Sequence, residues 1–258
     1  MSANRSFWRL AASTNVQKFI EYLTDATELR VVRIEFPYRP LIRYVWGEAD
    51  SLPVIQSLNI KGYFSHYTAV LLHGLTEQLP KAVYFNQEQA SQGGGEGTLR
   101  QQAINNAFRG KCRTTTNVAP FRGQTVTLLN GRNTGQTGVT EVIAGSGVKL
   151  RTTTVERTLI DAVVRPIYTG GIFEVAKAFA RARDDISVNK LTAMLKRLNF
   201  TYPYHQSIGY LLERAGVYKK SQLDLLRQFP REVDFFLDYG MKNPDYNADW
   251  RLFIPKGF

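Results

Sequence analysis

The pattern of apolar residues changes near residue 150, and this change constrains the fold more than any other feature of the chain. Before that point, short apolar runs such as KAVYFN (81–86) have the length and composition of strands. After it, apolar residues recur every three or four positions, as in amphipathic helices. These helical segments are 152–166, 170–182, 187–199 and 205–216, and SQLDLLRQF (221–229), VDFFLDY (233–239) and WRLFIP (250–255) follow them. The chain is therefore predicted to be α+β, with a helical C-terminal layer and late strands.

Two domains are expected within the 258 residues. In residues 1–60, a helix at 16–23 precedes two strands, LRVVRIEF (29–36) and LIRYVWG (41–47), which flank a proline-rich connection. This order is typical of the second half of a winged helix. Only RSFWRLAAS (5–13) is available for a further helix, so the winged-helix-like unit is expected to be degenerate. Residues 61–258 form the second domain, mixed at 61–150 and mainly helical at 151–258.

The stretch YFSHYTAVLLHGL (63–75) holds two of the three histidines, His66 and His73. On one helix these two residues lie roughly 10 Å apart along the axis. That separation is too large for one zinc ion, whose nitrogen ligands lie at about 2.1 Å. Ser65 is a favourable N-cap and Gly74 a favourable helix stop. The stretch is therefore predicted to be a core helix rather than a metal site.

The charge balance favours an anionic partner, with nucleic acid as the first candidate. Lys and Arg number 33 against 22 Asp and Glu, and the sequence pI is about 9.8. From Gly97 to Thr140 the chain has no acidic residue, and this span is predicted to form strands and turns that carry arginines. An ordinary basic surface is an equal alternative. The candidate DNA-binding residues are Arg30, Arg33, Arg39 and Arg43 of the N-terminal unit, with Arg39 at the tip of the wing, and Arg109, Lys111, Arg113 and Arg122 of the span.

The helix predicted at 152–166 has Thr153 and Glu156 at the spacing of a capping box, and it should end before Pro166. Arg157, Asp161 and Arg165 follow one another at intervals of four residues on the side opposite its apolar face. Such a row is either a solvated ladder of ion pairs or a contact surface.

A binding protein is favoured over an enzyme, and no catalytic residue, metal or cofactor is expected. Cys112 is the single cysteine, which excludes an internal disulfide, and no histidine lies near it in sequence. Asp161, Glu174 and Lys177 resemble the acid, acid, lysine set of metal-dependent nucleases, but the last two are spaced as a helical surface pair. AGSGVKL (144–150) resembles a nucleotidyltransferase element without its paired carboxylates. A nuclease or nucleotidyltransferase of a phage-defence locus is the alternative.

A cytoplasmic protein without a membrane partner is expected. No apolar run approaches the roughly 20 residues that a membrane-spanning helix needs. The N-terminus MSANRSFWRLAAST (1–14) also lacks the long apolar segment of a signal peptide.

Three ordered motifs resemble the AbiEi family, the antitoxins of type IV toxin-antitoxin systems. They are YFSHYTAVLLHGLTEQLPKAVYF (63–85), TTTVERTLIDAVVRPIYTGGIFEV (152–175) and IGYLLERAG (208–216). The resemblance implies an N-terminal winged helix that binds the promoter of its own operon. It also implies a C-terminal domain that counteracts a nucleotidyltransferase-like abortive-infection toxin without a stable complex. Within the motifs, the candidate surface residues are His66, Tyr67, Arg157, Asp161 and Arg165. A DNA-binding regulator without a toxin partner is a further alternative.

Overall fold

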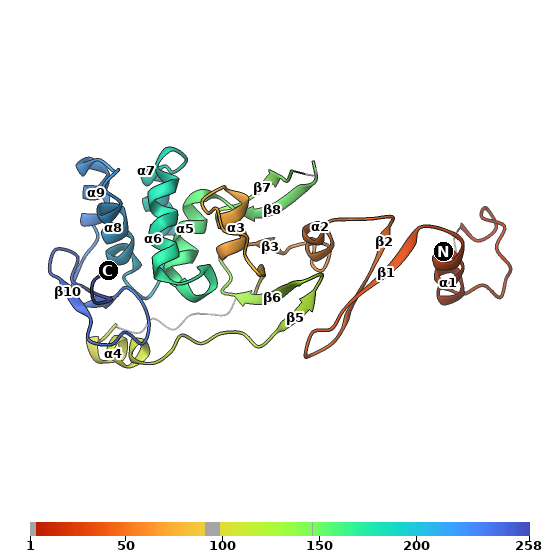
Figure 1. The fold of residues 1–258 in the computed structure, drawn as a ribbon, viewed down its shortest axis with the longest axis horizontal. Helices are drawn as coiled ribbons and strands as arrows, with labels where there is room; N and C mark the ends of the chain where they lie inside the picture. The colour runs from red at the N-terminus through yellow and green to blue at the C-terminus, as the bar shows by residue number, and fades with distance from the viewer. Residues whose placement is uncertain (1–3, 91–98, 146) are drawn as a thin grey trace.

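The structure is a computed structural model that describes residues 4–90, 99–145 and 147–258 (Figure 1). Its N-terminal part begins with α1 (Val16–Ala26), whose N-cap Asn15 accepts a hydrogen bond from the backbone N–H of Lys18. An antiparallel ribbon of β1 (Leu29–Ile34) and β2 (Leu41–Trp46) follows. Within residues 4–60 the only other α-helix is α2 (Ser51–Gln56), which comes after the ribbon. The three-helix head of a winged helix is therefore not confirmed.

The tip of the ribbon belongs to the core of the molecule. Ile34 and Phe36, together with Val54 and Ile55 of α2, are buried in one cluster with apolar side chains of the main sheet, which include Phe85. The opposite end of the ribbon leads to α1, which has no buried residue, and Figure 1 shows this end extending away from the body. A boundary after residue 60 would therefore pass through a hydrophobic core.

The main sheet is mixed and has six strands. Their order is β5 (Val118–Phe121), β6 (Gln124–Gly131), β4 (Ala82–Glu88), β3 (Tyr63–Phe64), β8 (Lys149–Thr153) and β7 (Val139–Ile143). The pairs β4–β6 and β3–β8 are parallel, and the other neighbours are antiparallel. The strand predicted at 81–86 is confirmed as β4.

The helical layer lies at the C-terminal end of the molecule (Figure 1). It contains α3 (His66–Leu72), α5 (Val155–Val164), the 3₁₀ turns Pro166–Thr169 and Ala182–Asp184, α6 (Ile172–Arg181), α7 (Val188–Leu198), α8 (Tyr204–Ala215) and α9 (Lys220–Arg227). A three-stranded sheet of β10 (Asp245–Asn247), β11 (Leu252–Ile254) and β9 (Phe235–Phe236) covers its end. The predicted α+β class with a helical C-terminal layer is confirmed.

Two local predictions are wrong. Residues 101–109 of the acid-free span form a helix, α4 (Gln101–Arg109), rather than strands and turns, because Ile104 and Phe108 insert one turn apart into the C-terminal core. The N-cap of α5 is Thr154 rather than Thr153, and Glu156 accepts a hydrogen bond from the backbone N–H of Ser187 instead of closing a capping box.

The residues 91–98 of the glycine-rich segment lie outside the described part of the chain. In the described part, no helix is long and apolar enough to cross a membrane.

Candidate functional site

A polar cavity of about 450 Å³ lies where α3 and α5 meet the ends of β4 and β6. We call it the arginine cavity, because its lining includes Arg113, Arg132, Arg157 and Arg165, together with Ser65, His66 and Asp161. His66 begins α3, and Arg157, Asp161 and Arg165 follow one another along α5, so two of the resembling motifs supply its wall. Arg113 and Arg132 come from the acid-free span.

A buried ion pair forms the inner wall of the arginine cavity. Nε of Arg157 donates to Oδ1 of Asp161 at 2.7 Å, and the two residues are only 5% and 8% exposed. Nη1 of Arg157 also donates to the carbonyl of Thr137 at 2.6 Å and to the hydroxyl of Thr134 at 3.2 Å. The alternative of a solvated ladder of ion pairs is therefore wrong for these two residues, because the 134–137 loop covers that side of α5.

Arg165 and Arg113 line the part of the arginine cavity that lies beside the segment following α4. Nη1 of Arg165 donates to the hydroxyl of Tyr239 at 3.0 Å and lies 3.2 Å from Sγ of Cys112. Arg113 is the next residue and is exposed. Within the described residues neither arginine forms an ion pair. A guanidinium keeps its charge at any physiological pH, so this end of the cavity is cationic.

His66 is held in a conformation that few residues adopt. Its φ is +50°, in the left-handed region, and its ring contacts the rings of Tyr84 and Tyr168 at centroid distances of 6.3 and 5.4 Å. Nδ1 and the hydroxyl of Ser65 are 2.9 Å apart. Burial lowers the pKa of His66 to about 4; Arg157 and Arg165 lower it as well, and Asp161 opposes them. The imidazole is therefore neutral at pH 7.

The remaining candidate of the first motif, Tyr67, and the second histidine of that motif, His73, lie outside the cavity. Tyr67 is buried against the helical core, with its hydroxyl near Thr76 and Gln78, and it does not line the arginine cavity. Nε2 of His73 donates to the carbonyl of Thr153 at 2.5 Å, which ties α3 to the end of β8.

A second layer of hydrogen bonds fixes the loop beside Arg157. Glu88 accepts from the backbone N–H groups of Thr134 and Gln136 at 3.0 and 3.1 Å, from the Thr134 hydroxyl, and from Tyr63 at 3.1 Å. Burial raises the pKa of Glu88, but these hydrogen bonds outweigh it and lower the pKa overall. The ionised carboxylate holds the 134–136 turn in place and, through it, the contacts of Arg157.

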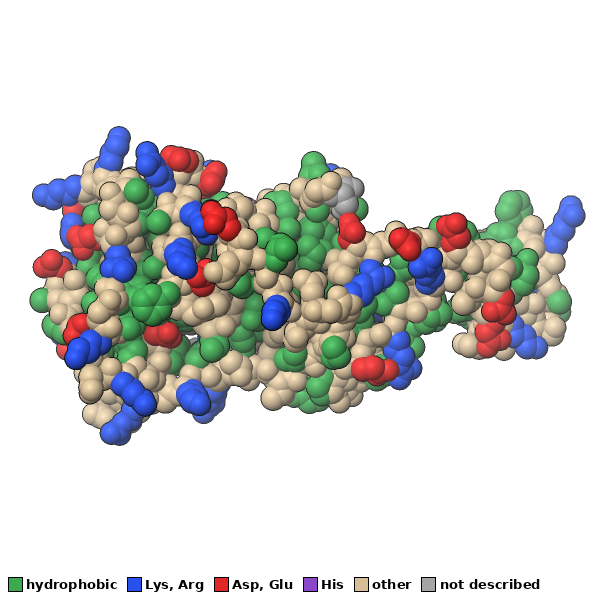
Figure 2. All heavy atoms as spheres, viewed as in Figure 1, with side chains coloured by type: hydrophobic (Ala, Val, Ile, Leu, Met, Phe, Trp, Pro, Cys, Tyr) green, Lys and Arg blue, Asp and Glu red, His purple; other side chains and the backbone are tan. Residues whose placement is uncertain are grey.

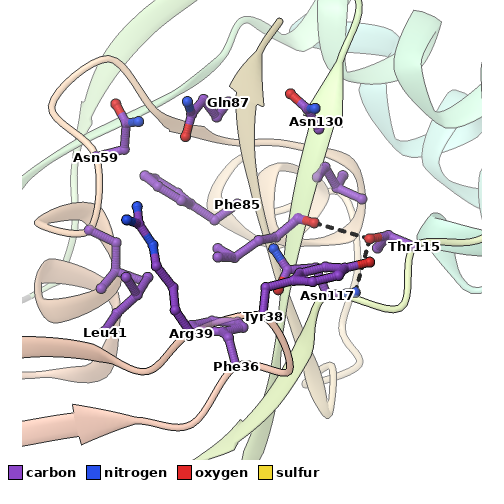
Figure 3. Close-up of a pocket in the computed structure, with 13 residues that line it drawn as sticks. Phe36, Tyr38, Arg39, Leu41, Asn59, Phe85, Gln87, Thr115, Asn117 and Asn130 are labelled. Atoms are coloured by element: carbon purple, nitrogen blue, oxygen red, sulfur yellow. Dashed lines mark hydrogen bonds between the residues drawn. The ribbon is translucent and has the colours of Figure 1, made fainter.

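A second cavity, of about 550 Å³, lies under the tip of the ribbon (Figure 3). Figure 3 shows Phe36, Tyr38 and Arg39 of the β1–β2 connection on one side of this cavity, and the amide side chains of Gln87 and Asn130 of the sheet on the other. Thr115, Leu129 and Asn130 line both cavities. Arg39 does lie between the strands as predicted, but the tip faces the sheet. It is therefore not the free end of a wing.

The remaining candidate DNA-binding residues do not form one surface. Arg43 donates to the carbonyls of Ile42, Ser57 and Leu58 at 2.6 to 2.9 Å, so it joins the ribbon to the end of α2. Arg30 and Arg33 are exposed and pair with Glu48 and Glu35. Arg122, in the β5–β6 turn, donates to the carbonyl of Ala49, whereas Arg109 and Lys111 lie at the end of α4. Figure 1 shows these two places far apart along the molecule, and Figure 2 shows basic side chains scattered over the face in view.

The acid, acid, lysine set is not assembled. Lys177 donates to Glu174 at 2.7 Å on the surface of α6, whereas Asp161 is engaged by Arg157. In residues 4–90, 99–145 and 147–258, groups of three or more His, Cys, Asp or Glu that could hold a metal ion are absent.

Comparison with known proteins supports the fold and leaves the function open. No family model matches the chain, and no curated protein matches it. Its structure is similar to the crystal structure of the RV2827C protein from Mycobacterium tuberculosis, with a TM-score of 0.57 and 14% sequence identity. The match covers 98% of this chain and 83% of that chain. At this identity the similarity concerns the fold alone.

Proposed function

We propose that this protein is an antitoxin of a type IV toxin-antitoxin system, acting in the cytoplasm against a nucleotidyltransferase-like toxin. Its action needs no cofactor and no stable complex with the toxin. A second role, as a regulator that binds the promoter of its own operon, accompanies the first.

The main support is the way in which the three resembling motifs come together. Phe64 of the first motif pairs with Thr152 of the second, in parallel strands β3 and β8. Helix α5 of the second motif packs against α3 of the first and α8 of the third. His66, Arg157, Asp161 and Arg165 then line one cavity. The first two motifs, whose lining residues His66 and Arg157 are about 90 positions apart in sequence, thus build one polar site. A concave site with a few convergent polar groups is the usual form of a binding site in proteins.

The promoter-binding role rests on charge. The excess of 33 basic over 22 acidic residues favours an anionic partner. Arg30 and Arg33 remain exposed on a two-stranded ribbon, and ribbons of this kind enter DNA grooves in other proteins.

Co-expression tests the antitoxin role. The protein is produced together with the product of the neighbouring gene, which the proposal expects to be a nucleotidyltransferase-like toxin, in cells whose growth that product arrests. The wild-type chain should restore growth, Arg165→Ala should restore less, and Arg109→Ala, an exposed arginine outside the cavity, should behave as the wild type. Protein levels are compared by immunoblot. Failure of the well-expressed wild-type chain to restore growth would refute the antitoxin role, and promoter binding in that case would favour a regulator without a toxin partner.

A further inference from the structure

The arginine cavity has an excess of positive charge that its own residues do not neutralise. Its described lining contains four arginines and one carboxylate, Asp161, which is already engaged by Arg157. His66 is neutral and adds no charge. Partly buried like charges are unfavourable unless an anion is present, so the composition of the wall is that of a site for an anionic ligand.

Hydrogen-bond donors at the cationic end of the cavity are also unused. In the described part of the chain, the guanidinium of Arg113 has no hydrogen-bond partner, and Arg165 uses only Nη1. Two guanidinium groups with free N–H donors match the oxygens of a phosphate group, which accepts such bonds in pairs. Arg132 is less available, because it donates to the carbonyls of Leu198 and Asn199 at the end of α7.

The rest of the cavity suits a flat, polar ring. Tyr168 and Phe200 contribute aromatic side chains to the lining, and Arg132 lies over the ring of Phe200 at 5.0 Å. Asn130 and Gln89 contribute amides that can donate to and accept from a base edge. The volume of about 450 Å³ lies in the range of small-molecule sites, which begins near roughly 300 Å³.

We propose that the arginine cavity binds a nucleoside phosphate, with the phosphate at Arg113 and Arg165 and the base beside Tyr168 and Phe200. The ligand is either a free nucleotide or the 5′-phosphorylated end of a nucleic acid strand, because both present the same chemistry. This site is separate from the surface that would bind a promoter, and it does not depend on the antitoxin role.

Calorimetric titration of the purified full-length chain tests the proposal. The four nucleoside monophosphates are compared with the corresponding nucleosides and with ribose 5-phosphate. At least one monophosphate should bind about tenfold or more tightly than its nucleoside, because the charge-assisted hydrogen bonds to the phosphate are lost without it. It should also bind several-fold more tightly than ribose 5-phosphate, which lacks the stacking base. Equal affinity for nucleotide and nucleoside, or no binding of any phosphate at about 1 mM, would overturn the proposal.

Substitutions locate the site. Arg113→Ala should weaken nucleotide binding about tenfold or more, and Arg113→Lys should weaken it less, because the charge is kept but the paired geometry is lost. Arg109→Ala is the matched control, four residues away and outside the cavity. Since Arg113 is exposed, its variants should fold, which circular dichroism checks. Equal affinities of Arg113→Ala and Arg109→Ala would place the ligand elsewhere and overturn the assignment.

Oligonucleotides distinguish a free nucleotide from the phosphorylated end of a strand as the ligand. A 5′-phosphorylated tetranucleotide is compared with the same strand bearing a 5′-hydroxyl and with the mononucleotide. Tighter binding of the phosphorylated strand identifies a strand end, and tighter binding of the mononucleotide identifies a free nucleotide. Either result supports the phosphate site. The proposal is contradicted if the strand binds equally well with and without its 5′-phosphate and the mononucleotide does not bind.

Discussion

Gly209 in α8 faces the ring of Trp250, and a methyl group on this glycine would lie 2.1 Å from the ring atom Cζ3. Trp250 is fully buried, and its Nε1 donates to the carboxylate of Glu213 one turn further along α8, at 2.6 Å. The glycine therefore permits the ring to lie directly against the helix. This close approach gives the third motif, IGYLLERAG, a structural reason for a glycine in mid-helix, where it would otherwise be unfavourable.

Gly209→Ala should destabilise the protein although alanine is the better helix former. The added methyl group must displace a fully buried ring, which typically costs about 1–3 kcal/mol. Urea unfolding followed by tryptophan fluorescence measures the change. Gly110→Ala is the control, because a methyl group there would meet nothing within 4 Å. Equal stability of the two variants would show that α8 and Trp250 are not packed as described.

Asp161→Ala should lower the free energy of unfolding by about 3–5 kcal/mol, because it leaves Arg157 buried without its partner. The matched control is Glu48→Ala, which removes the partner of Arg30 in an exposed pair and should leave the unfolding curve nearly unchanged. Chemical unfolding of both variants gives the comparison. Similar curves would mean that the Arg157–Asp161 pair is solvated.

Stability should fall as the pH is lowered from about 6.5 to about 4. Burial lowers the pKa of both His66 and His205 to about 4, whereas the pKa of histidine in an unfolded chain is about 6.5. In this interval the unfolded chain binds more protons than the native protein, so acid favours unfolding, and the contribution is complete above pH 6.5.

His66→Asn provides the corresponding test, since asparagine tolerates the left-handed φ of this position. The variant should lose stability less steeply between pH 6.5 and 4 than the wild type does. In the wild type, the NMR signals of the His66 ring should stay constant down to about pH 5. A titration near pH 6.5 would show that the ring is hydrated.

A chain that begins at residue 61 should fold poorly. It lacks Ile34, Phe36, Val54 and Ile55, and each buried apolar side chain of this size contributes about 1.5–3 kcal/mol. A chain that begins at Glu28 loses only α1 and the preceding segment, which carry no buried residue among those described, and it should unfold much like the whole protein. Thermal unfolding compares the two. A stable, cooperative 61–258 fragment would support the predicted domain boundary.

If the protein binds its promoter through the ribbon, affinity should fall steeply with salt. Contacts with about five phosphates would give a slope of about −4.5 when the logarithm of the binding constant is plotted against the logarithm of the salt concentration. The double variant Arg30→Ala/Arg33→Ala should flatten this slope more than Arg109→Ala/Lys111→Ala. Arg43 is unsuited to this test, because its guanidinium holds three backbone carbonyls. A larger effect of Arg109→Ala/Lys111→Ala would show that DNA binds at the end of α4 instead of at the ribbon.

The elements predicted well from the sequence are those with both an apolar periodicity and a clear stop residue. Helices α5, α7 and α8 combine an apolar face with a stop at Arg165 before proline, at the left-handed Asn199 and at Gly216. Helix α4 was missed because its apolar signal consists of only Ile104 and Phe108 among polar residues. Strand β10 (Asp245–Asn247) also gave no apolar run to detect.

The site was predicted only in part. Periodicity placed Arg157 and Asp161 on one face of their helix, but it could not show that the 134–137 loop would bury that face. Arg132, Asn130 and Tyr168 were missed, because their place in the arginine cavity depends on tertiary packing. The sequence also could not show that Phe36 and Phe85, nearly 50 positions apart, belong to one buried cluster on either side of the predicted boundary.

The ribbon is anchored in the core at its connecting loop, whereas its open end is not anchored in this way. Ile34 pairs with Leu41 beside the buried Phe36, whereas Leu29 pairs with Trp46 next to α1, which buries nothing. Local opening should therefore start at the Leu29–Trp46 rung and move toward the loop. Backbone amides near Ile34 should then exchange with deuterium more slowly than those near Leu29. The N-terminal helix α1 is thus tethered by a pair of strands whose rigidity increases with distance from α1.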